Sequence, residues 1–388
     1  MWVRDSGATV AKAMADGYNS FQDESTIKVT VIPAGQYLAK LGNAIAAGNP
    51  PDLATTDFTY VALLGSTNQF IDITDRAEAL DFYPDGLSQT HLRAGTFEEK
   101  VYAMPFSGEA SILVYNKDLF AEAGLDPETA PSTWDEIKDA AAKITALGDG
   151  KSGFYFAGQC AGCNTFTLLP LMWASGGDIL NEDGTAATIE GNEALRGALT
   201  LYKEMWDAGS IDPSAQSDNG SNWTTLFMSG NVGMMSIGAF GISALRADYP
   251  DIDFGVGYLP GNEGDWSSYA GGDDIGIPQG AQNVEGAWDF IEWSLQTEQQ
   301  VENLAKNDVV PVRTDDALTE YQALDPRYVV TGSAEAEGRA PYSTYYEGLF
   351  NDLNGPFGAM VQRAVFDGDV DGAMEQAQAD FTKILEGN

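Results

Sequence analysis

The first 57 residues alternate between short apolar runs and segments with apolar residues at helical spacing. This alternation limits the possible folds more than any other feature of the chain. The expected elements are a first strand that ends over residues 2–5, a helix over 6–21, a strand over 27–32, a helix over 37–47 and a third strand into which residues 49–57 turn. Strands that alternate with helices pair in parallel, with the helices as crossovers on the sheet faces. The sequence therefore predicts the α/β class with parallel sheets.

In such sheets, ligands bind beyond the carboxyl ends of the strands. The segments that follow predicted strands or open the next helix are therefore the first candidates for a site. They are Asp5-Ser6, Gln36-Tyr37, Thr55 to Asp57, and Phe106 to Glu109.

Composition excludes several classes of function. The chain has 388 residues, of which 44% are hydrophobic, enough for two or three domains with large cores. Its 58 acidic and 20 basic residues give a formal net charge of −38, which argues against nucleic-acid and anionic-membrane partners. The acids are scattered, which predicts a solvated surface; adaptation to high salt is the alternative. No apolar run approaches the ~18 residues of a membrane span.

The chain has one histidine and two cysteines. A Ser-His-Asp triad or a histidine-based zinc site would have to use His91, whose polar, helical-looking surroundings predict a surface or capping role. Cys160 and Cys163 form Cys-Ala-Gly-Cys in a polar stretch. That setting predicts a small disulfide ring in an oxidising compartment, with free thiols or redox activity as the alternative.

Residues 101–144 carry the most informative local signals. Two strands are expected, over residues 101–105 and 111–115, with Phe106 to Glu109 as a crossover where two structural units meet. A helix start follows, in which Thr133 caps the first turn and Glu136 reaches back to the cap.

Four motifs occur here in order: Tyr102-x-x-Pro105; Val114-Tyr115-Asn116-Lys117-Asp118-Leu119-Phe120; Ala123-Gly124-Leu125; and Pro131-x-Thr133-Trp134-Asp135-Glu136. In this order and spacing they resemble the family of extracellular solute-binding proteins of ABC transporters, in particular its carbohydrate-binding, maltose-binding branch. Two later patterns extend the resemblance, Phe227-x-x-Gly230-x-x-x-Met234 and the helix over residues 287–293.

The resemblance implies a two-lobed fold, each lobe a mainly parallel sheet flanked by helices, with the ligand cleft at the hinge. The N-lobe would comprise residues 1–107 and 272–311, and the C-lobe residues 108–271 and 312–388. It also implies an exported monomer without catalytic activity or cofactor, which captures an oligosaccharide between its lobes and delivers it to the permease of an ABC importer. The location would be extracellular or periplasmic. The precursor would be a membrane-anchored lipoprotein whose leader has been removed.

A sugar site needs aromatic platforms for C–H faces, and acids and amides for hydroxyl groups. Glu109 lies six residues before Tyr115, the spacing of a sugar-binding acid in the maltose-binding branch; a hinge salt bridge is the alternative. Phe240 matches the place of a sugar-stacking aromatic in that branch. The other candidates are Gln36, Tyr37, Thr56, Asp57, Phe58, Phe106, Ser107, Trp223, Trp266, Tyr269, Gly272, Asp273, Asp274, Tyr345 and Tyr346.

Other functions remain open at this point. They are a binding protein for a non-sugar solute, such as a polyamine or a metal chelate, and a carbohydrate-active hydrolase that uses two carboxylates. No metal is expected. Asp367 to Gly372 imitates the start of a calcium loop, but Gln378 stands where that loop requires a bidentate Glu.

Overall fold

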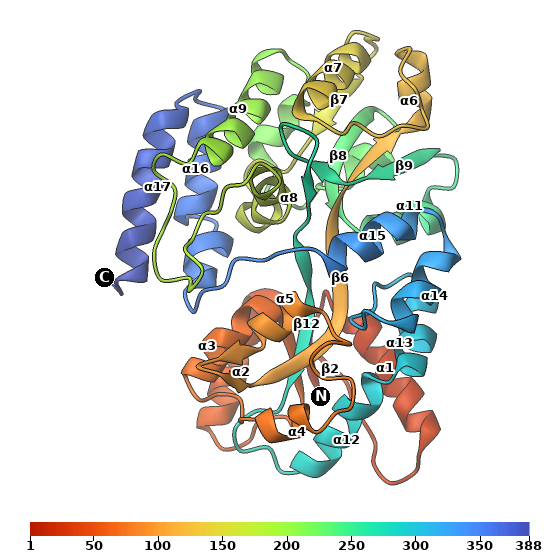
Figure 1. The fold of residues 1–388 in the computed structure, drawn as a ribbon, viewed down its shortest axis with the longest axis vertical. Coiled ribbons are helices and arrows are strands. Elements are labelled where there is room, and N and C mark those ends of the chain that lie inside the picture. The colour runs from red at the N-terminus through yellow and green to blue at the C-terminus, as the bar shows by residue number, and fades with distance from the viewer. Residues whose placement is uncertain (388) are drawn as a thin grey trace. The chain divides into compact units, whose positions relative to one another are not determined.

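The computed structural model describes residues 1–387, and the chain divides into two compact units (Figure 1). Unit 1 consists of residues 1–110 and 270–336, and unit 2 of residues 111–269 and those from 337 onward. Residues 312–336 thus lie in unit 1, whereas the sequence analysis assigns them to the second lobe. The reason is packing, because the two helices of this segment contact other elements of unit 1.

Unit 1 contains β1 (Trp2–Arg4), α1 (Ala8–Phe21), β2 (Thr30–Ile32), α2 (Ala34–Ala46), β3 (Ala54–Asp57), η1 (Phe58–Tyr60), α3 (Val61–Ser66), α4 (Thr74–Glu78), α5 (Gln89–Ala94), β4 (Thr96–Phe97), β5 (Lys100–Val101), the first part of β6 (Ala103–Asn116), β12 (Ala270–Gly276), α12 (Val284–Ser294), α13 (Thr297–Asn303), η3 (Ala305–Asn307), α14 (Asp316–Leu324) and α15 (Arg327–Ala336). The main sheet of this unit has the order β2-β1-β3-β12-β6. Strand β1 is parallel to β2 and β3, and β12 is antiparallel to both β3 and β6.

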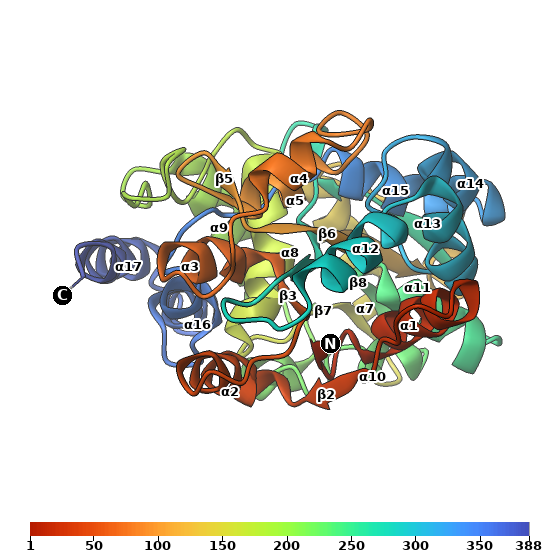
Figure 2. The same ribbon diagram turned by 90° about the horizontal axis from the view of Figure 1, so that it is seen from below.

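Two hydrophobic clusters flank the sheet of unit 1. Ala103 and Met104 are consecutive in β6 and enter different clusters, because successive side chains of a strand point to opposite faces. One cluster packs the sheet against α1 and α12, which lie side by side in Figure 2. The other includes Tyr37 and Leu41 of α2 and Val61 of α3. The alternation of strands and helices in the sequence thus produces the layered α/β unit that it predicts.

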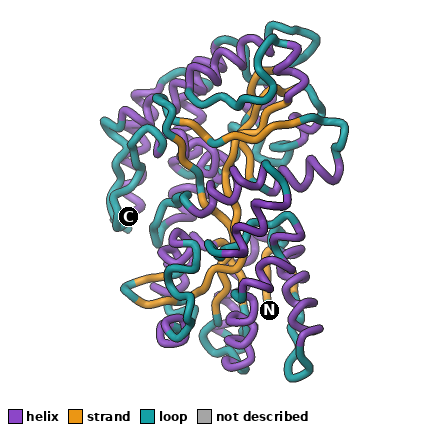
Figure 3. The backbone as a smooth tube through the Cα atoms, turned by 45° about the vertical axis from the view of Figure 1, so that its right-hand side comes forward, coloured by secondary structure: helices purple, strands orange, loops and turns teal. Residues whose placement is uncertain are grey.

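Unit 2 contains the remainder of β6, then α6 (Lys117–Glu122), α7 (Trp134–Thr145), β7 (Ser152–Tyr155), α8 (Ala161–Trp173), α9 (Glu193–Asp207), η2 (Pro213–Ser217), α10 (Thr225–Met228), β8 (Val232–Gly238), α11 (Phe240–Asp248), β9 (Phe254–Gly257), β10 (Leu259–Pro260), β11 (Trp266–Ser267), the π-helical turn η4 (Glu347–Asn351), α16 (Pro356–Val365) and α17 (Val370–Leu385). Every residue of β8 is buried. This strand pairs antiparallel with β6 and parallel with β7, and β9 also pairs with β6. In each unit the strands lie on the inside and the helices around them, as Figure 3 shows.

One local prediction is wrong. Residues 101–105 and 111–115 are not separate strands joined by a crossover, because residues 103–116 form the single strand β6. Antiparallel pairing with β12, from Ala103 opposite Gly276 to Ala110 opposite Ala270, continues the ladder through Phe106 and Glu109. This pairing lies more than 150 residues away along the chain, so no local signal reveals it.

Among residues 1–387, no helix combines the length and the apolar character that crossing a lipid bilayer requires.

Candidate functional site

An ion-paired cluster lies where β1, β3 and β12 of unit 1 meet. The Arg4 guanidinium contacts the Asp57 carboxylate at 3.3 Å and also bonds to Asp273. Burial would lower the pKa of Arg4, but Asp273 and Asp57 outweigh this effect and raise it. Gly7 leaves the Asp273 carboxylate room at the start of α1, where a Cβ would collide with it. The sequence analysis proposes both acids as candidates but does not include Arg4.

The second oxygen of Asp57 is also engaged. It accepts hydrogen bonds from the Thr59 backbone N–H at 3.2 Å and from the Thr59 hydroxyl at 2.6 Å, and so caps η1. The Asp57 side chain is 28% exposed, against 6% for Asp273. Of the two acids, Asp57 is therefore the one that offers the more accessible carboxylate.

A second, fully buried cluster lies beside the first. His91 of α5 contacts the Asp274 carboxylate through Nδ1 at 2.6 Å and the Gly271 carbonyl through Nε2 at 2.8 Å. Glu335 of α15 approaches Nε2 at 3.8 Å, and the Phe58 ring stacks on the imidazole. Both ring nitrogens thus face acceptors, which favours the imidazolium form.

The electrostatics of this cluster follow from burial and pairing. Burial alone would lower the pKa of His91, but the adjacent Asp274 carboxylate and Glu335 raise it to about 9. Burial raises the pKa of Asp274, against the opposing effect of His91, and burial also raises the pKa of Glu335. The predicted surface position of His91 is wrong: its side chain is completely buried, because residues from β12 and α15 enclose it.

Three other candidates of unit 1 lie along β6 and β12. Glu109 is partly exposed, and one of its carboxylate oxygens accepts a hydrogen bond from the Ala110 backbone N–H at 3.0 Å. Ser107 is buried, and Gly272, at φ +124°, lies so close to the Ser107 carbonyl that a Cβ would collide with it. A side chain at position 272 would therefore separate the two strands.

Three aromatic candidates of unit 1 are buried in regular elements and do not stand free at strand ends. Tyr37 lies in α2, Phe58 in η1 and Phe106 in β6, and each ring is 1% exposed. The Tyr37 hydroxyl donates to the Trp2 carbonyl at 3.3 Å, and burial followed by Asp273 raises its pKa. Tyr37 and Phe106 belong to the hydrophobic clusters of unit 1, so a position near a strand end does not by itself make an aromatic ring available to a ligand. Thr56 is also fully buried, whereas Gln36 is exposed.

Unit 2 brings aromatic side chains together in a row, which we call the aromatic row: Phe240, Trp223, Phe166, Tyr269 and Trp173. The successive ring centroids lie 5.8, 6.4, 5.1 and 6.0 Å apart. Phe240, the first residue of α11, is 44% exposed; Trp223 and Phe166 are partly buried; Tyr269 and Trp173 are buried. The row therefore presents its Phe240 end to solvent.

The sequence analysis proposes Phe240, Trp223 and Tyr269 but misses Phe166 and Trp173. Those two stand seven residues apart on α8, that is, two helical turns along one face. This spacing is the only signal that could have found them, and it is equally typical of a core helix.

The remaining aromatic candidates differ in their surroundings. Tyr346 is buried and shares a hydroxyl–hydroxyl hydrogen bond of 2.7 Å with Tyr269, at the edge of the aromatic row. Tyr345 is 43% exposed. Trp266 lies in β11 and stacks on Tyr258 with ring centroids 4.1 Å apart, so its ring packs beside the β10–β11 hairpin.

Cys160 and Cys163 form a disulfide at the start of α8. The polar stretch is a turn at Gly158-Gln159 that leads into α8, and the Cys160 sulfur caps this helix by accepting a hydrogen bond from the Cys163 backbone N–H at 3.2 Å. Asp369, in the calcium-like stretch, caps α17 and pairs with Arg363. In the part of the chain that the structure describes, no group of three or more His, Cys, Asp or Glu side chains is arranged to hold a metal ion.

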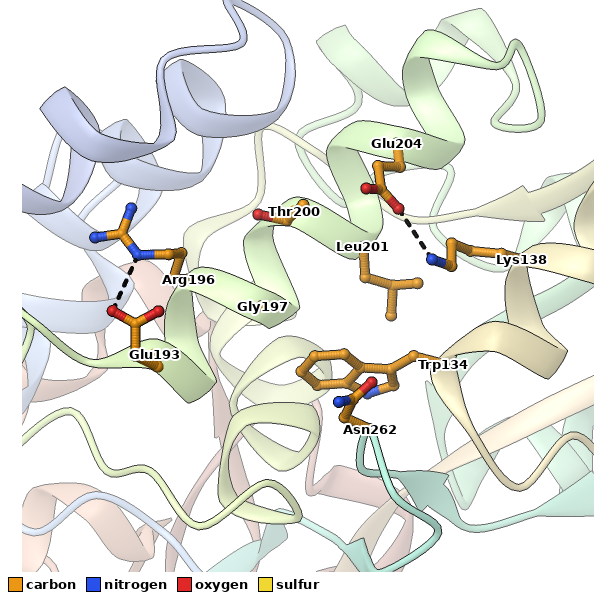
Figure 4. Close-up of a pocket in the computed structure, with 9 residues that line it drawn as sticks. All are labelled: Trp134, Lys138, Glu193, Arg196, Gly197, Thr200, Leu201, Glu204 and Asn262. Carbon is orange, nitrogen blue, oxygen red and sulfur yellow. Dashed lines mark hydrogen bonds and ion pairs between the residues drawn. The ribbon is translucent and has the colours of Figure 1, made fainter.

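A cavity of about 280 Å³ opens between α7 and α9 of unit 2 (Figure 4). Trp134 and Leu201 form its apolar floor, and two ion pairs stand beside it, Lys138 with Glu204 and Arg196 with Glu193. None of the residues proposed from the sequence lines this cavity.

Sequence and structure comparisons both find similarity to known binding proteins. The family model described as bacterial extracellular solute-binding protein matches residues 3–301. A protein of Brucella abortus named as a binding protein is 30% identical over 332 residues, which cover 83% of this chain and 77% of that protein. The sn-glycerol-3-phosphate-binding periplasmic protein UgpB of Escherichia coli is 27% identical, over 77% of this chain and 70% of UgpB.

Among solved structures, the cyclic alpha-maltosyl-1,6-maltose binding protein from Arthrobacter globiformis superposes with a TM-score of 0.85 at 25% identity. The match covers 100% of this chain and 99% of that one.

Proposed function

Because the chain belongs to the family of bacterial extracellular solute-binding proteins, we propose that it captures a neutral oligosaccharide and delivers it to an ABC importer. In this proposal both units supply contacts to the sugar, and no bond of the sugar is made or broken. The family consists of binding proteins, and the Arthrobacter protein that the fold matches binds cyclic alpha-maltosyl-1,6-maltose.

The observation that carries the proposal is the aromatic row of unit 2. Sugar rings present apolar C–H faces, and aromatic rings with an exposed or partly exposed face are the side chains that stack on them. Phe240, Trp223 and Phe166 supply three such rings in succession, with centroid spacings of 5.8 and 6.4 Å. A succession of rings supports a ligand of more than one sugar unit.

The charges of unit 1 support a neutral ligand over a phosphate ester. Arg4 is engaged by both Asp57 and Asp273, so this group of three carries a net charge of −1. Glu109 adds a further carboxylate on β6. Carboxylates accept hydrogen bonds from sugar hydroxyls, whereas a phosphate would meet like charge. Taken by itself, the similarity to UgpB favours sn-glycerol 3-phosphate as the ligand. This compound is therefore included among the ligands tested.

Calorimetry tests the proposal with a fixed panel: maltose, mannobiose, cyclic alpha-maltosyl-1,6-maltose, sn-glycerol 3-phosphate and spermidine. We expect at least one neutral sugar to bind at least tenfold more tightly than the phosphate and the polyamine. Chromatography after long incubation should return that sugar unchanged. Binding of only the phosphate or spermidine, or appearance of shorter sugars, would contradict the proposal.

A division into two lobes, the monomeric state, the permease partner and a lipid anchor on the precursor are further parts of the proposal. Small-angle scattering of the sugar-bound protein should give a smaller radius of gyration at an unchanged molecular mass. Equal radii with and without saturating sugar would argue against closure on the ligand.

A further inference from the structure

The disulfide of unit 2 lies against a glycine in another segment of the same unit. Gly220 has φ +98°, and a Cβ on it would lie 3.0 Å from the Cys160 sulfur and 3.1 Å from the Cys163 sulfur. Both the left-handed backbone and the close sulfurs therefore require glycine at position 220. The two cysteines form the wall against which this backbone rests.

The loop that contains Gly220 is fixed on its other side by Asp218, which is buried. One carboxylate oxygen of Asp218 accepts from the backbone N–H groups of Gly220 at 3.0 Å and Asn222 at 3.2 Å, and the other accepts from the Tyr155 hydroxyl. The Asp218 carbonyl accepts from the Gln159 N–H, directly before Cys160. The loop is thus tied to β7 and to the disulfide segment at several points.

Trp223 follows in the same loop. Its backbone N–H donates to the Gly220 carbonyl at 3.4 Å. Its ring lies edge-on to Phe240 and to Phe166, and so occupies the middle of the three rings proposed to stack on the sugar. Trp223 is the third residue after Gly220, where the disulfide meets the backbone.

We propose that the Cys160–Cys163 disulfide, acting through Gly220, positions Trp223 for ligand binding. The inference rests on the proposed function, because it assigns Trp223 a contact with sugar. The physical reason is the space that the sulfurs occupy. Two bonded sulfurs approach each other far more closely than two thiols can, and serine hydroxyls are smaller than either, so both reduction and replacement by serine change the surface against which Gly220 packs. The disulfide and Gly220 are positioning elements, since neither is proposed to touch the sugar.

The position of the Trp223 ring can be followed without any ligand. The chain has eight tryptophans, and 5-fluorotryptophan labelling gives each a ¹⁹F resonance. The resonance that disappears in Trp223→Phe is that of Trp223. We expect Gly220→Ala, Cys160→Ser/Cys163→Ser and reduction of the wild type by dithiothreitol each to shift or broaden the Trp223 resonance. Reoxidation should restore the wild-type signal, and dithiothreitol should leave the double serine variant unchanged.

The matched control is Gly264→Ala in the same unit. Gly264 has φ +101°, but within 4 Å a Cβ on it would meet only the Ser132 carbonyl, at 3.9 Å, among the described residues. This variant carries the same backbone strain without the contact to sulfur. Backbone strain should therefore lower the melting temperature by a similar amount in Gly264→Ala and in Gly220→Ala. The Trp223 resonance should stay in place in Gly264→Ala.

Binding is then measured by titrating each protein with maltose and with mannobiose. The sugar that binds oxidised wild type should bind Gly220→Ala and the double serine variant roughly tenfold more weakly, a change of about 1.4 kcal/mol. The Gly264→Ala variant should keep wild-type affinity. Melting curves taken without sugar establish that each variant is folded at the titration temperature.

The outcomes separate the two claims. If the Trp223 resonance stays in place in both Gly220→Ala and Cys160→Ser/Cys163→Ser, the positioning role is overturned, whatever sugar binds. A shifted resonance with unchanged affinity overturns the contribution to binding. If neither maltose nor mannobiose, nor any other member of the panel, binds oxidised wild type, the proposed function fails, and the resonance alone decides whether the disulfide positions Trp223.

Discussion

Replacing Asp274 by Asn should remove a pH dependence of stability that the buried His91 creates. The pKa of His91 is raised to about 9 in the folded protein, against about 6.5 for an unperturbed histidine. A raised pKa means that the folded state binds the proton more tightly. The resulting stabilisation is therefore complete below about pH 6.5 and is lost as the pH rises through 9.

The magnitude follows from the size of the shift. At about 1.4 kcal/mol per pKa unit, the imidazolium contributes about 3 kcal/mol. For a unit of this size, a change of 1 kcal/mol moves the melting temperature by about 2–4 °C. The wild type should therefore melt about 6–12 °C lower at pH 9.5 than at pH 6. The raised pKa values of Asp274 and Glu335 act in the same sense, because both groups take up protons more readily when folded.

The chain offers an unusually clean window for this measurement, because His91 is its only histidine. In the Asn variant, neutral His91 can donate from Nε2 to the Gly271 carbonyl and accept at Nδ1 from the carboxamide, so the variant should fold. Asp16→Asn, at an exposed position on α1 of the same unit, makes the same change in net charge and is the control.

Calorimetric melting curves of the three proteins from pH 6 to 9.5 test the reasoning. The slope should persist in Asp16→Asn and become much smaller in Asp274→Asn. Equal slopes in the two variants, or a flat wild-type profile, would refute the assignment of an imidazolium to this cluster.

Three further predictions follow from the candidate site and the surface. Glu109→Gln and Phe240→Ala should each weaken sugar binding roughly 10- to 100-fold. A hydrogen bond to a charged group is worth about 1.5–3 kcal/mol, and loss of an aromatic contact costs a similar amount. Calorimetry measures the affinity, and unchanged affinity in both variants would mean that the site lies elsewhere. With a net charge of −38, the protein should melt at a lower temperature as salt falls from about 1 M to 0.01 M, because the screening length grows from about 3 to 30 Å; melting temperatures independent of salt would show that self-repulsion is minor. Alkylation under denaturing conditions without reductant should leave Cys160 and Cys163 unmodified by mass spectrometry, whereas two alkylated thiols would contradict an oxidised pair.

Local signals predict the elements that local interactions build. The helix start after Pro131 forms as expected: the Thr133 hydroxyl caps α7 by accepting from the Glu136 N–H at 3.2 Å. Glu136 itself reaches one residue further than expected, to the Ser132 N–H at 2.7 Å. The α/β class is confirmed as well, because the period of the apolar pattern depends only on neighbouring residues.

Predictions fail where partners come from far along the chain. Nothing near His91 reveals that Asp274 and Glu335 will enclose it, and the consecutive Asp273 and Asp274 look equivalent in the sequence. In the structure they make contacts with different clusters, one at Arg4 and the other at His91. Such assignments depend on strand register, which one sequence does not fix.

The position of β12 also has a consequence for synthesis and export. This strand pairs with β3 in the sheet of unit 1, where Asp273 lies opposite Asp57 across more than 200 residues of chain. A polypeptide that emerges from the ribosome from its N-terminus therefore cannot complete this sheet until all of residues 111–269 have been made. The same holds for bringing Asp273 to Arg4 and Asp274 to His91. Long-range pairing of this kind folds slowly, because a large loop must close before any contact compensates for it. The sheet of unit 1 thus stays incomplete during most of the synthesis, and an incompletely folded polypeptide is easier to thread across a membrane than a folded one.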